Sequence, residues 1–379
     1  MNQDEIGVYI HFPYCEKKCP YCDFNSHITK HIKHRRFLEA YKKDFDYFFC
    51  KLKEIPKFVS IFFGGGTPSL MEPFVVNEII NHICTKFDAS KNNIEITLEA
   101  NPSSFEVEKF KDFKSAGINR VSVGVQSFIE EDLKKLGRVH NSTQATNAII
   151  KANEIFDRFS FDLIYARENQ TIQQWQEELE FALKEFKPEH ISLYSLTIEK
   201  GTEFFKLHQD GKLTIPRNQE DFYEITNEIC AKYGLGRYEV SNYSTSQNKC
   251  RHNILYWTGK QYIGIGPGAH GRIEVNEGRV ATMNVNSPEK YLKSIEESGN
   301  AIQIFEKLND EKIAWEFVST GLRTVYGFQL NEITQKFINT QKLQTLVTED
   351  LLTQNKTHII PTEKGLSLCD GISKFIFDI

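Results

Sequence analysis

The sequence predicts an α/β protein, because apolar runs typical of strands alternate with amphipathic stretches typical of helices. Six runs rich in Val, Ile, Phe and Tyr are expected to form strands, at residues 5–12, 58–66, 93–100, 120–127, 159–166 and 190–197. The helical stretches between them include 35–54, 104–116, 142–157 and 172–186. This alternation is typical of a parallel sheet. We therefore expect a partial, TIM-like (β/α)6 barrel, with an open doubly wound sheet as the alternative.

The pattern changes after about residue 245. Residues 259–271, GKQYIGIGPGAHG, are rich in glycine, which predicts a turn with close approach of another backbone. Beyond residue 300 the pattern is mainly helical, with one short apolar strand at 357–361. We expect a barrel at 1–245, a connecting segment at 246–299 and a small C-terminal domain at 300–379. That domain is expected to be helical, winged-helix-like, and to act as a lid or packing module.

Composition and charge exclude several classes of function. The 379 residues suit two domains, and 40% hydrophobic residues allow a sizeable core. A net charge of −5 argues against bulk electrostatic binding of nucleic acid. The N-terminus lacks the apolar segment of a signal peptide, and no apolar run is long enough to span a bilayer. The expectation is a cytoplasmic protein with no membrane anchor and no nucleic-acid partner.

Three of the eight cysteines, Cys15, Cys19 and Cys22, lie close together near the N-terminus. In a reducing compartment such a cluster indicates metal binding or catalysis. Three thiolates are one ligand short of a closed zinc site, which His11 or His27 could complete. They also suit a 4Fe–4S cluster, in which three irons take thiolates and the fourth keeps an open position. The spacing alone leaves both readings open.

Unusual residues accompany the predicted strands. They are the cysteine loop after the first strand, GGGTPS (64–69) after the second, LEANP (98–102) and GVQS (124–127) ending the third and fourth, and DLIY (162–165) in the fifth. The C-terminal ends of barrel strands share one rim, where active sites are built. A cluster, a glycine loop, the Glu99 carboxylate and the Gln126 amide would therefore converge. Structural zinc gives no reason for such convergence.

These motifs, in this order, resemble the radical S-adenosylmethionine (SAM) superfamily. The segments that carry the resemblance are YIHFPYCEKKCPYCDFNSH, FFGGGTPSL, LEANP, RVSVGVQSF, LGRVH, FDLIY, ISLYSLTIEKGT, RHNILYW and YIGIGPGAHG. They are similar to the oxygen-independent coproporphyrinogen III oxidase-like family and, within it, to its haem-chaperone branch. A weaker match, GLRTVYGF (321–328), extends into the C-terminal region. The resemblance implies a radical SAM barrel.

The resemblance also implies roles for individual residues. Cys15, Cys19 and Cys22 would ligate three irons of a 4Fe–4S cluster, and SAM would chelate the fourth iron. Residues matching Tyr9, Gly65, Gly66, Thr67 and Glu99 contact SAM in the related oxidase, and those matching Tyr21, Gln126, Arg138 and Asp162 belong to a second SAM position there. One departure concerns residues 166–168: this chain has Ala-Arg-Glu where relatives often have Gly-Leu-Pro. The loop near Asp162 is therefore altered.

Two features favour the haem-chaperone branch over the oxidase. The oxidase carries a further cysteine where this chain has Phe24, and a long N-terminal arm for which Cys15 leaves no room. HNILYW (252–257) matches a motif associated with haem binding, and imidazole is a common axial ligand of haem iron. His252 is therefore expected to contact haem, with Cys250 or His270 as alternatives. Without the resemblance, a core histidine beside an aromatic pair is the simpler interpretation.

Three functional hypotheses follow. The first is a haem chaperone that binds a 4Fe–4S cluster, SAM and haem, and hands haem to apoproteins, with respiratory proteins as the expected recipients. The second is a radical SAM catalyst that oxidatively decarboxylates the propionates of coproporphyrinogen III. The third is a zinc-stabilised α/β binding protein. Phe24 and HNILYW favour the first hypothesis.

Overall fold

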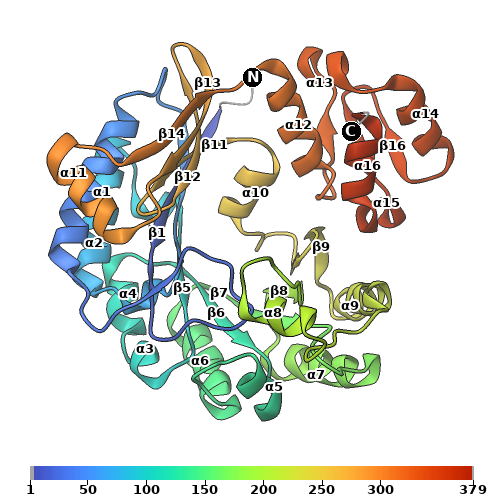
Figure 1. Ribbon diagram of the computed structural model, residues 1–379, viewed down its shortest axis with the longest axis horizontal. Coiled ribbons are helices and arrows are strands. Elements are labelled where there is room, and N and C mark those ends of the chain that lie inside the picture. Colours follow the sequence, from blue (N-terminus) through green and yellow to red (C-terminus); the bar gives the residue numbers. More distant parts are fainter. Residues whose placement is uncertain (1–3, 378–379) are drawn as a thin grey trace.

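The computed structural model describes residues 4–377 (Figure 1). The strands of its large sheet are β1 (Glu5–Phe12), β4 (Lys57–Gly65), β5 (Glu95–Ala100), β6 (Arg120–Gln126), β7 (Arg158–Tyr165), β8 (His190–Ser195), β9 (Gly236–Glu239), β10 (Asn242–Ser244), β11 (Gln261–Ile265), β12 (His270–Val275), β13 (Gly278–Asn284) and β14 (Ile302–Lys307). Their spatial order is β14-β13-β12-β11-β1-β4-β5-β6-β7-β8-β10-β9.

The six strands predicted from the sequence form the parallel centre of this sheet. From β1 through β4, β5, β6 and β7 to β8, each strand pairs in parallel with its neighbour. Their central residues are buried because side chains pack on both faces of the sheet. The prediction of an α/β fold with a parallel sheet is confirmed.

The helices before β9 follow the sheet as an arc in Figure 1, in which α1, α2, α4, α6 and α7 lie along its outer side. They are α1 (His34–Phe49), α2 (Pro73–Lys86), α3 (Ser104–Glu108), α4 (Phe110–Ala116), α5 (Glu130–Lys135), α6 (Ser142–Ile155), α7 (Ile172–Phe186), α8 (Glu203–Gln209) and α9 (Gln219–Lys232). Helix α7 illustrates how they form. Thr171 and Gln174 make a capping box at its start, and Trp175, Leu179 and Leu183 give it one buried face.

The sheet continues beyond the six central strands into residues 261–307, most of which lie in the segment 246–299 that the sequence predicted as a connection. Strand β11 pairs in parallel with β1, and β12, β13 and β14 continue as antiparallel neighbours. A Cβ on Gly264 would lie 1.8 Å from the His270 carbonyl oxygen, so the glycine permits the close approach of β11 and β12. This region also contains α10 (Arg251–Trp257) and α11 (Pro288–Ser298). The boundaries at residues 245 and 300 stay a prediction.

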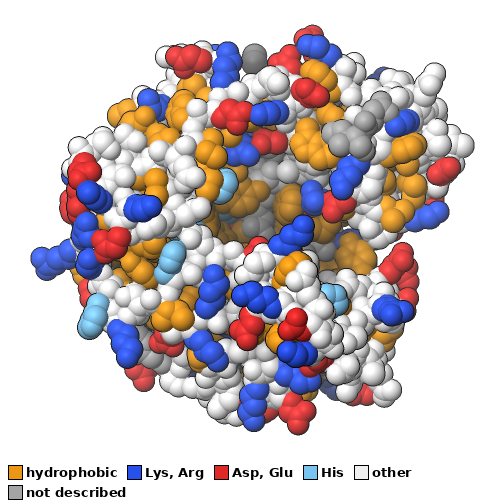
Figure 2. Space-filling model, in the orientation of Figure 1, with side chains coloured by type: hydrophobic (Ala, Val, Ile, Leu, Met, Phe, Trp, Pro, Cys, Tyr) orange, Lys and Arg blue, Asp and Glu red, His pale blue; other side chains and the backbone are white. Residues whose placement is uncertain are grey.

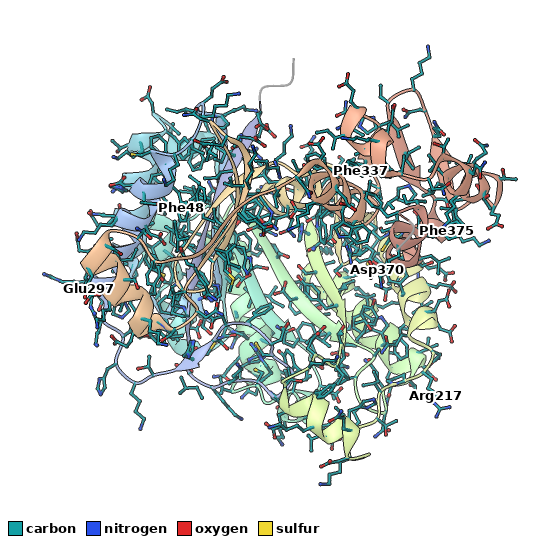
Figure 3. The ribbon with its side chains drawn as sticks, turned by 45° about the horizontal axis from the view of Figure 1, so that its top comes forward. Phe48, Arg217, Glu297, Phe337, Asp370 and Phe375 are labelled. Atoms are coloured by element: carbon teal, nitrogen blue, oxygen red, sulfur yellow. The ribbon has the colours of Figure 1, made fainter. Side chains whose placement is uncertain are left out.

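Most of the C-terminal region is helical and has a core of its own. Its elements are α12 (Asp310–Gly321), β15 (Phe328–Gln329), α13 (Glu332–Phe337), α14 (Thr340–Thr348), β16 (Leu352–Gln354), β17 (His358–Pro361), α15 (Glu363–Ser367) and α16 (Cys369–Ile376). The three strands form a small sheet in the order β15-β17-β16. In Figure 3, Phe337, Asp370 and Phe375 mark this region on the side opposite Phe48 and Glu297. Within residues 4–377, no helix is both long enough and apolar enough to cross a membrane.

Candidate functional site

A cavity of about 360 Å³ lies where the parallel strands end. The predicted residues that line it are Cys15, Cys19, Tyr21, Cys22, Gly65, Gly66, Thr67, Glu99, Gln126, Arg138 and Asp162. They come from the loop after β1 and from the ends or following loops of β4, β5, β6 and β7. The convergence predicted at this rim is therefore present, and we call this space the cysteine cavity.

The three thiols of the cysteine cavity are partly buried and are surrounded by hydrogen-bond donors. The Thr67 hydroxyl lies 3.4 Å from Cys15 Sγ, and Arg138 Nη1 lies 3.5 Å from Cys19 Sγ. Burial raises the pKa of Cys15 and of Cys22. Donors of this kind stabilise a thiolate, which is the form that binds a metal. The donor set therefore fits an iron–sulfur cluster.

No three His, Cys, Asp or Glu side chains among the described residues are grouped so that they could hold a single metal ion. A 4Fe–4S cluster takes each thiolate on a different iron, so its cysteines need not converge on one point.

The loop between β1 and α1 contains a turn in which the Cys22 amide donates to the Cys19 carbonyl at 3.1 Å. It also contains the short strands β2 (Tyr14–Cys15) and β3 (His27–Ile28), which pair in parallel.

The glycines after β4 make room for this cysteine loop. A Cβ on Gly66 would lie 2.5 Å from the Tyr14 carbonyl oxygen, and Gly65 has a φ of +110°. The Gly66 amide donates to Phe12 O at 2.7 Å, and the Thr67 amide donates to Tyr14 O at 2.8 Å. The glycine run was expected to expose its backbone to a ligand. In the structure, Gly65 and Gly66 line the cysteine cavity, and Gly66 also lets the two loops approach within hydrogen-bond distance.

Two partly buried carboxyl groups, Glu99 and Asp162, face the cysteine cavity. Burial and the nearby Asp162 raise the pKa of Glu99 to about 8, although the Gly65 amide donates to its Oε2 at 3.2 Å. Burial raises the pKa of Asp162 to about 6, although the Ser122 hydroxyl donates to Oδ1 at 3.2 Å. A bound cation would favour ionisation of both groups. The cavity is therefore suited to a positively charged ligand.

Sequence reasoning missed Asn101, which organises one wall of the cysteine cavity. Its Nδ2 donates to Thr67 Oγ1 at 3.0 Å, and its Oδ1 accepts from Arg138 Nη2 at 2.6 Å. Arg138 Nη2 also donates to the Gly124 carbonyl at 2.8 Å. Two residues later, Gln126 ends the strand with a left-handed φ of +70°. The signal was available, since Asn101 follows Glu99 by two positions in LEANP. Its role became visible only with its partners, which lie in the loops after β4 and after α5.

The altered loop after β7 leaves Asp162 on the cavity wall. Ala166 has a left-handed φ of +55°, and the buried Arg167 forms ion pairs with Glu178 and, at 3.0 Å, with Asp132. Arg167 Nη1 also donates to the Ile164 carbonyl at 2.8 Å. These contacts anchor the loop on α5 and α7, so the unusual Ala-Arg-Glu sequence is compatible with the position of Asp162.

A second cavity, of about 520 Å³, adjoins the first and shares Phe24, Gly65 and Glu99 with it. Its other lining residues are Tyr9, His11, Asn25, Tyr256, Tyr262, Gly268, His270, Met283 and Asn286. We call it the aromatic cavity. Tyr9, predicted to contact SAM, lines this cavity and is absent from the lining of the cysteine cavity. Figure 2 shows that the middle of this face is hollowed and that hydrophobic side chains lie around the hollow.

His252 is not on the surface of either cavity. Its side chain is fully buried; its Nδ1 lies 2.8 Å from Ser60 Oγ and its Nε2 lies 2.7 Å from the Tyr256 hydroxyl. Burial lowers the pKa of His252 to about 3. Both ring nitrogens are therefore occupied, and an iron cannot reach them in this conformation. The expected direct contact between His252 and haem stays a prediction, and this geometry argues against it.

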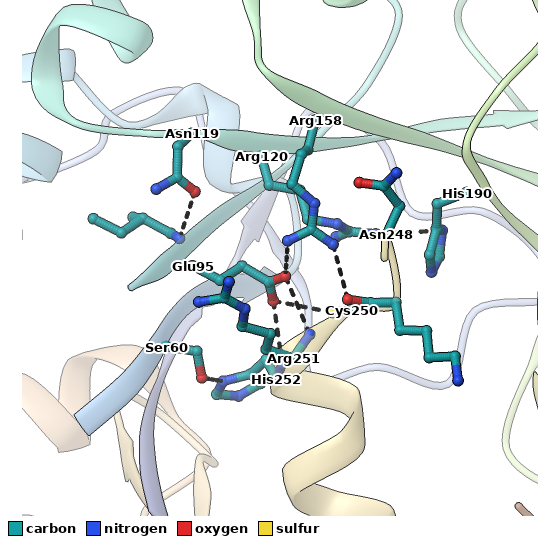
Figure 4. A network of polar contacts seen from close by, with 12 residues as sticks. Ser60, Glu95, Asn119, Arg120, Arg158, His190, Asn248, Cys250, Arg251 and His252 are labelled. Atoms are coloured by element: carbon teal, nitrogen blue, oxygen red, sulfur yellow. Dashed lines mark hydrogen bonds and ion pairs between the residues drawn. The ribbon is translucent and has the colours of Figure 1, made fainter. Parts of the chain in front are cut away.

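The start of α10, which carries the HNILYW motif, is anchored on β5 (Figure 4). The buried Glu95 carboxylate accepts hydrogen bonds from the amides of Arg251 and His252, both at 3.1 Å, and pairs with Arg158 at 2.6 Å. Cys250 Sγ lies 3.4 Å from the same carboxylate and is buried, so it is also withdrawn from both cavities. In this arrangement the motif packs a helix against the barrel strands.

The chain is similar to several known proteins. The model of the radical SAM superfamily matches residues 9–182. Heme chaperone HemW of Bacillus subtilis is 33% identical over 334 residues, which cover 87% of this chain and 86% of that protein. HemW of Buchnera aphidicola subsp. Acyrthosiphon pisum is 37% identical, with coverages of 79% and 81%. The mitochondrial radical S-adenosyl methionine domain-containing protein 1 of Danio rerio is 34% identical, with coverages of 90% and 80%.

A solved structure shares the fold. Coproporphyrinogen III oxidase (HemN) from Escherichia coli matches with a TM-score of 0.80 over 99% of this chain and 90% of that chain, at 20% sequence identity. At this identity the likeness concerns the fold alone. The partial barrel and its C-terminal extension are thus a known arrangement.

Proposed function

The chain belongs to the radical SAM superfamily, in the family that includes heme chaperone HemW, and from that premise we propose that it is a haem chaperone. It would bind haem and hand it to apoproteins, with respiratory proteins as the proposed recipients and the cytoplasm as the proposed location. The observation that carries this proposal is the aromatic cavity beside the cysteine cavity, in a chain similar to HemW over most of its length. Membership of the superfamily implies a 4Fe–4S cluster and SAM.

In this proposal Cys15, Cys19 and Cys22 hold the cluster. The bound cluster supplies redox chemistry and one open iron position to which SAM can bind. Thr67 and Arg138 donate hydrogen bonds toward two of the thiolates and so offset part of their negative charge. Gly65, Gly66 and Thr67 keep the cysteine loop against β4, which positions the three sulfurs relative to the sheet.

Glu99 would receive the positively charged part of SAM in the cysteine cavity. Asp162, Tyr21, Gln126 and Arg138 line the same cavity and are proposed to form the second SAM position, as the resemblance implies. Asp162 has a partly buried carboxyl group, and Arg138 offers a guanidinium that already contacts Gly124 and Asn101. Tyr9 lines the adjoining aromatic cavity and would contact SAM from there. Gly65 and Glu99 line both cavities at the point where they meet.

Phe24 is a further reason to prefer haem carriage. It lines both cavities, and 58% of its surface is exposed, so its ring is accessible to a ligand. The related oxidase has a cysteine at this position, according to the resemblance. An exposed aromatic ring at the junction of the two cavities suits packing against a flat apolar ligand. A porphyrin is such a ligand.

Titration of the full-length protein with ferric haem tests the proposal. We expect a saturable shift of the Soret absorbance band at about one haem per chain. Absence of saturation would contradict haem carriage.

A parallel anaerobic assay of the reduced, cluster-reconstituted protein with coproporphyrinogen III is expected to yield no protoporphyrinogen. Formation of that product would instead support the oxidase hypothesis.

A further inference from the structure

We propose that His270, and not His252 of the HNILYW motif, supplies the imidazole that binds haem iron, and that haem occupies the aromatic cavity. This inference rests on the proposed function and adds the binding site and the iron ligand to it. The two histidines differ in burial: His252 is fully buried, whereas His270 is exposed and lines the aromatic cavity.

His270 has the properties that an iron ligand requires. It is the first residue of β12, and within residues 4–377 its ring has no hydrogen-bond partner. Burial and the neighbouring Arg272 lower its pKa, so the ring is neutral at pH 7, and neutral imidazole is the form that binds metal. The other histidine of this cavity, His11, uses Nδ1 with the Tyr9 hydroxyl at 3.0 Å and Nε2 with the Asn25 carbonyl at 2.9 Å. His270 is thus the histidine of this cavity with an available nitrogen.

The walls of the aromatic cavity suit a porphyrin. Its volume of about 520 Å³ lies within the usual range for ligand pockets. Tyr256 and Tyr262 pack edge to face with ring centroids 4.5 Å apart, and Phe24 adds a third ring. Met283 adds an apolar side chain directly opposite His270 on the neighbouring strand. A planar apolar ligand can pack against such rings while an imidazole at the same wall reaches its metal.

HNILYW still contributes to this site through Tyr256. The Tyr256 hydroxyl lies 2.7 Å from His252 Nε2, and Ser60 contacts the other nitrogen of the same ring. The buried imidazole therefore holds Tyr256 at the cavity wall. His252 is accordingly a positioning residue, which explains how one motif can affect haem binding without touching the iron.

The loop that carries His270 is joined directly to the cysteine loop. Asn25 Nδ2 donates to the Pro267 carbonyl at 3.0 Å and to the Asn286 carbonyl at 2.9 Å. Gly268 has a φ of +75°, and a Cβ there would lie 2.6 Å from Asn25 Nδ2, so a larger residue would disturb this contact. Because Asn25 is three residues after Cys22, the proposed haem ligand and the proposed cluster ligands share one rigid support.

One axial ligand from the protein is expected. His270 and Met283 are cross-strand partners, so their side chains project on the same face of the sheet. Two ligands on one side cannot occupy opposite axial positions of the same haem. Strands β12 and β13 would therefore supply one iron ligand, His270, with Met283 packed beside it.

The test is a ferric-haem titration of the full chain, followed by Soret absorbance, with wild type, His270→Ala and His31→Ala. His31 is an exposed histidine that lines neither cavity, and it serves as the matched control. We expect His270→Ala to weaken haem binding by at least about tenfold and to change the Soret position, while His31→Ala binds as wild type does. Added imidazole should restore the wild-type spectrum to His270→Gly.

The outcomes separate the two proposals. If wild type shows no saturable binding, haem carriage fails and this inference fails with it. If wild type binds and His270→Ala binds with the same affinity and spectrum, only the assignment of His270 is overturned. Far-UV circular dichroism of each variant verifies that it is folded, and His270→Tyr gives a second reading, since a phenolate ligand is expected to shift the Soret band without unfolding the strand.

Discussion

The two cavities share three residues but are built on different kinds of backbone. The cysteine cavity lies at the C-terminal ends of parallel strands, where each strand contributes a loop or a terminal side chain. The aromatic cavity is bounded on one side by β1, the ends of β4 and β5 and the cysteine loop, and on the other by the antiparallel pair β12–β13, by β11 and by the end of α10. The first follows a general rule of parallel sheets. The second depends on a particular pairing of distant segments.

The histidines illustrate what this difference means for prediction. The residue types of the cysteine cavity occur in compact motifs, so their chemistry could be recognised before their positions were known. His252 also lies in a compact motif, yet its ring is enclosed between Ser60 and Tyr256. A motif therefore predicts that a residue has a functional or structural role. The burial of that residue's side chain determines whether it contacts a ligand or supports a neighbouring side chain.

The largest expected effect is the loss of the cluster on substitution of the cysteine cavity. Replacing Cys22 with Ala removes one of three proposed thiolate ligands, so iron and sulfide should fall to a small fraction of the wild-type content after anaerobic reconstitution. Chemical analysis of iron and acid-labile sulfide measures this. Cys50→Ala is the matched control, because Cys50 is exposed and lines neither cavity. Equal iron content in both variants would contradict the cluster site.

The next largest effect concerns the stability of the α10 anchor. His252→Ala leaves a void in a buried site and removes the partners of Ser60 and Tyr256, so the free energy of unfolding should fall by about 3 kcal/mol. Urea denaturation of the variant measures this fall, with His31→Ala as a control expected to stay within about 0.5 kcal/mol of wild type.

The same variant sharpens the comparison between the two histidines. In the absence of denaturant, folded His252→Ala is expected to bind haem more weakly but to keep the wild-type Soret position, since the iron ligand is unchanged. If the Soret position instead changes as it does in His270→Ala, His252 is the residue that binds the iron.

A third effect is a pH dependence of SAM binding to the cysteine cavity. The pKa of Glu99 is about 8 without ligand, because of burial and the nearby Asp162, and a cationic ligand favours the ionised carboxylate. Binding therefore releases a proton below pH 8, and affinity should rise with pH until Glu99 is ionised, by at most about tenfold per pH unit for one proton. Calorimetry of SAM binding to the reconstituted protein at several pH values measures this.

Glu99→Gln supplies the control for that dependence. It keeps the shape of the side chain and removes the titration, so its affinity should be lower above pH 8 and nearly independent of pH between 7 and 8. The remaining slope at lower pH belongs to Asp162, whose pKa is about 6. An unchanged profile in Glu99→Gln would assign the proton to another group.

The smallest expected effect concerns Met283, which lies beside His270 in the proposed haem site. Met283→Leu preserves side-chain volume and removes the sulfur, so haem affinity should stay within about twofold of wild type and the Soret band should not move. The same titration serves as the measurement. A shifted band would show that the Met283 thioether binds iron, and the assignment of a single protein ligand would then be wrong.

Much of the cysteine cavity could be predicted because its signals are local. Three cysteines within eight residues, a glycine run and a carboxylate at a strand end are readable without any fold. The network around Asn101 could not be predicted in the same way, because it joins Thr67 and Arg138, from two separate loops, and Gly124, from β6. The close packing of Gly66 on Tyr14 could not be predicted either, because it depends on where the cysteine loop lies.

The sequence by itself determined the alternation of strands and helices, and with it a parallel sheet whose strand ends collect Cys15, Glu99 and Asp162. That information is carried by hydrophobic periodicity and chain order, which are properties of neighbouring residues. Only the tertiary structure decided that β11 lies beside β1, that His252 is enclosed and that His270 is exposed. Ser60 and His252 are 192 residues apart, and burial depends on contacts across such distances, which no local pattern records.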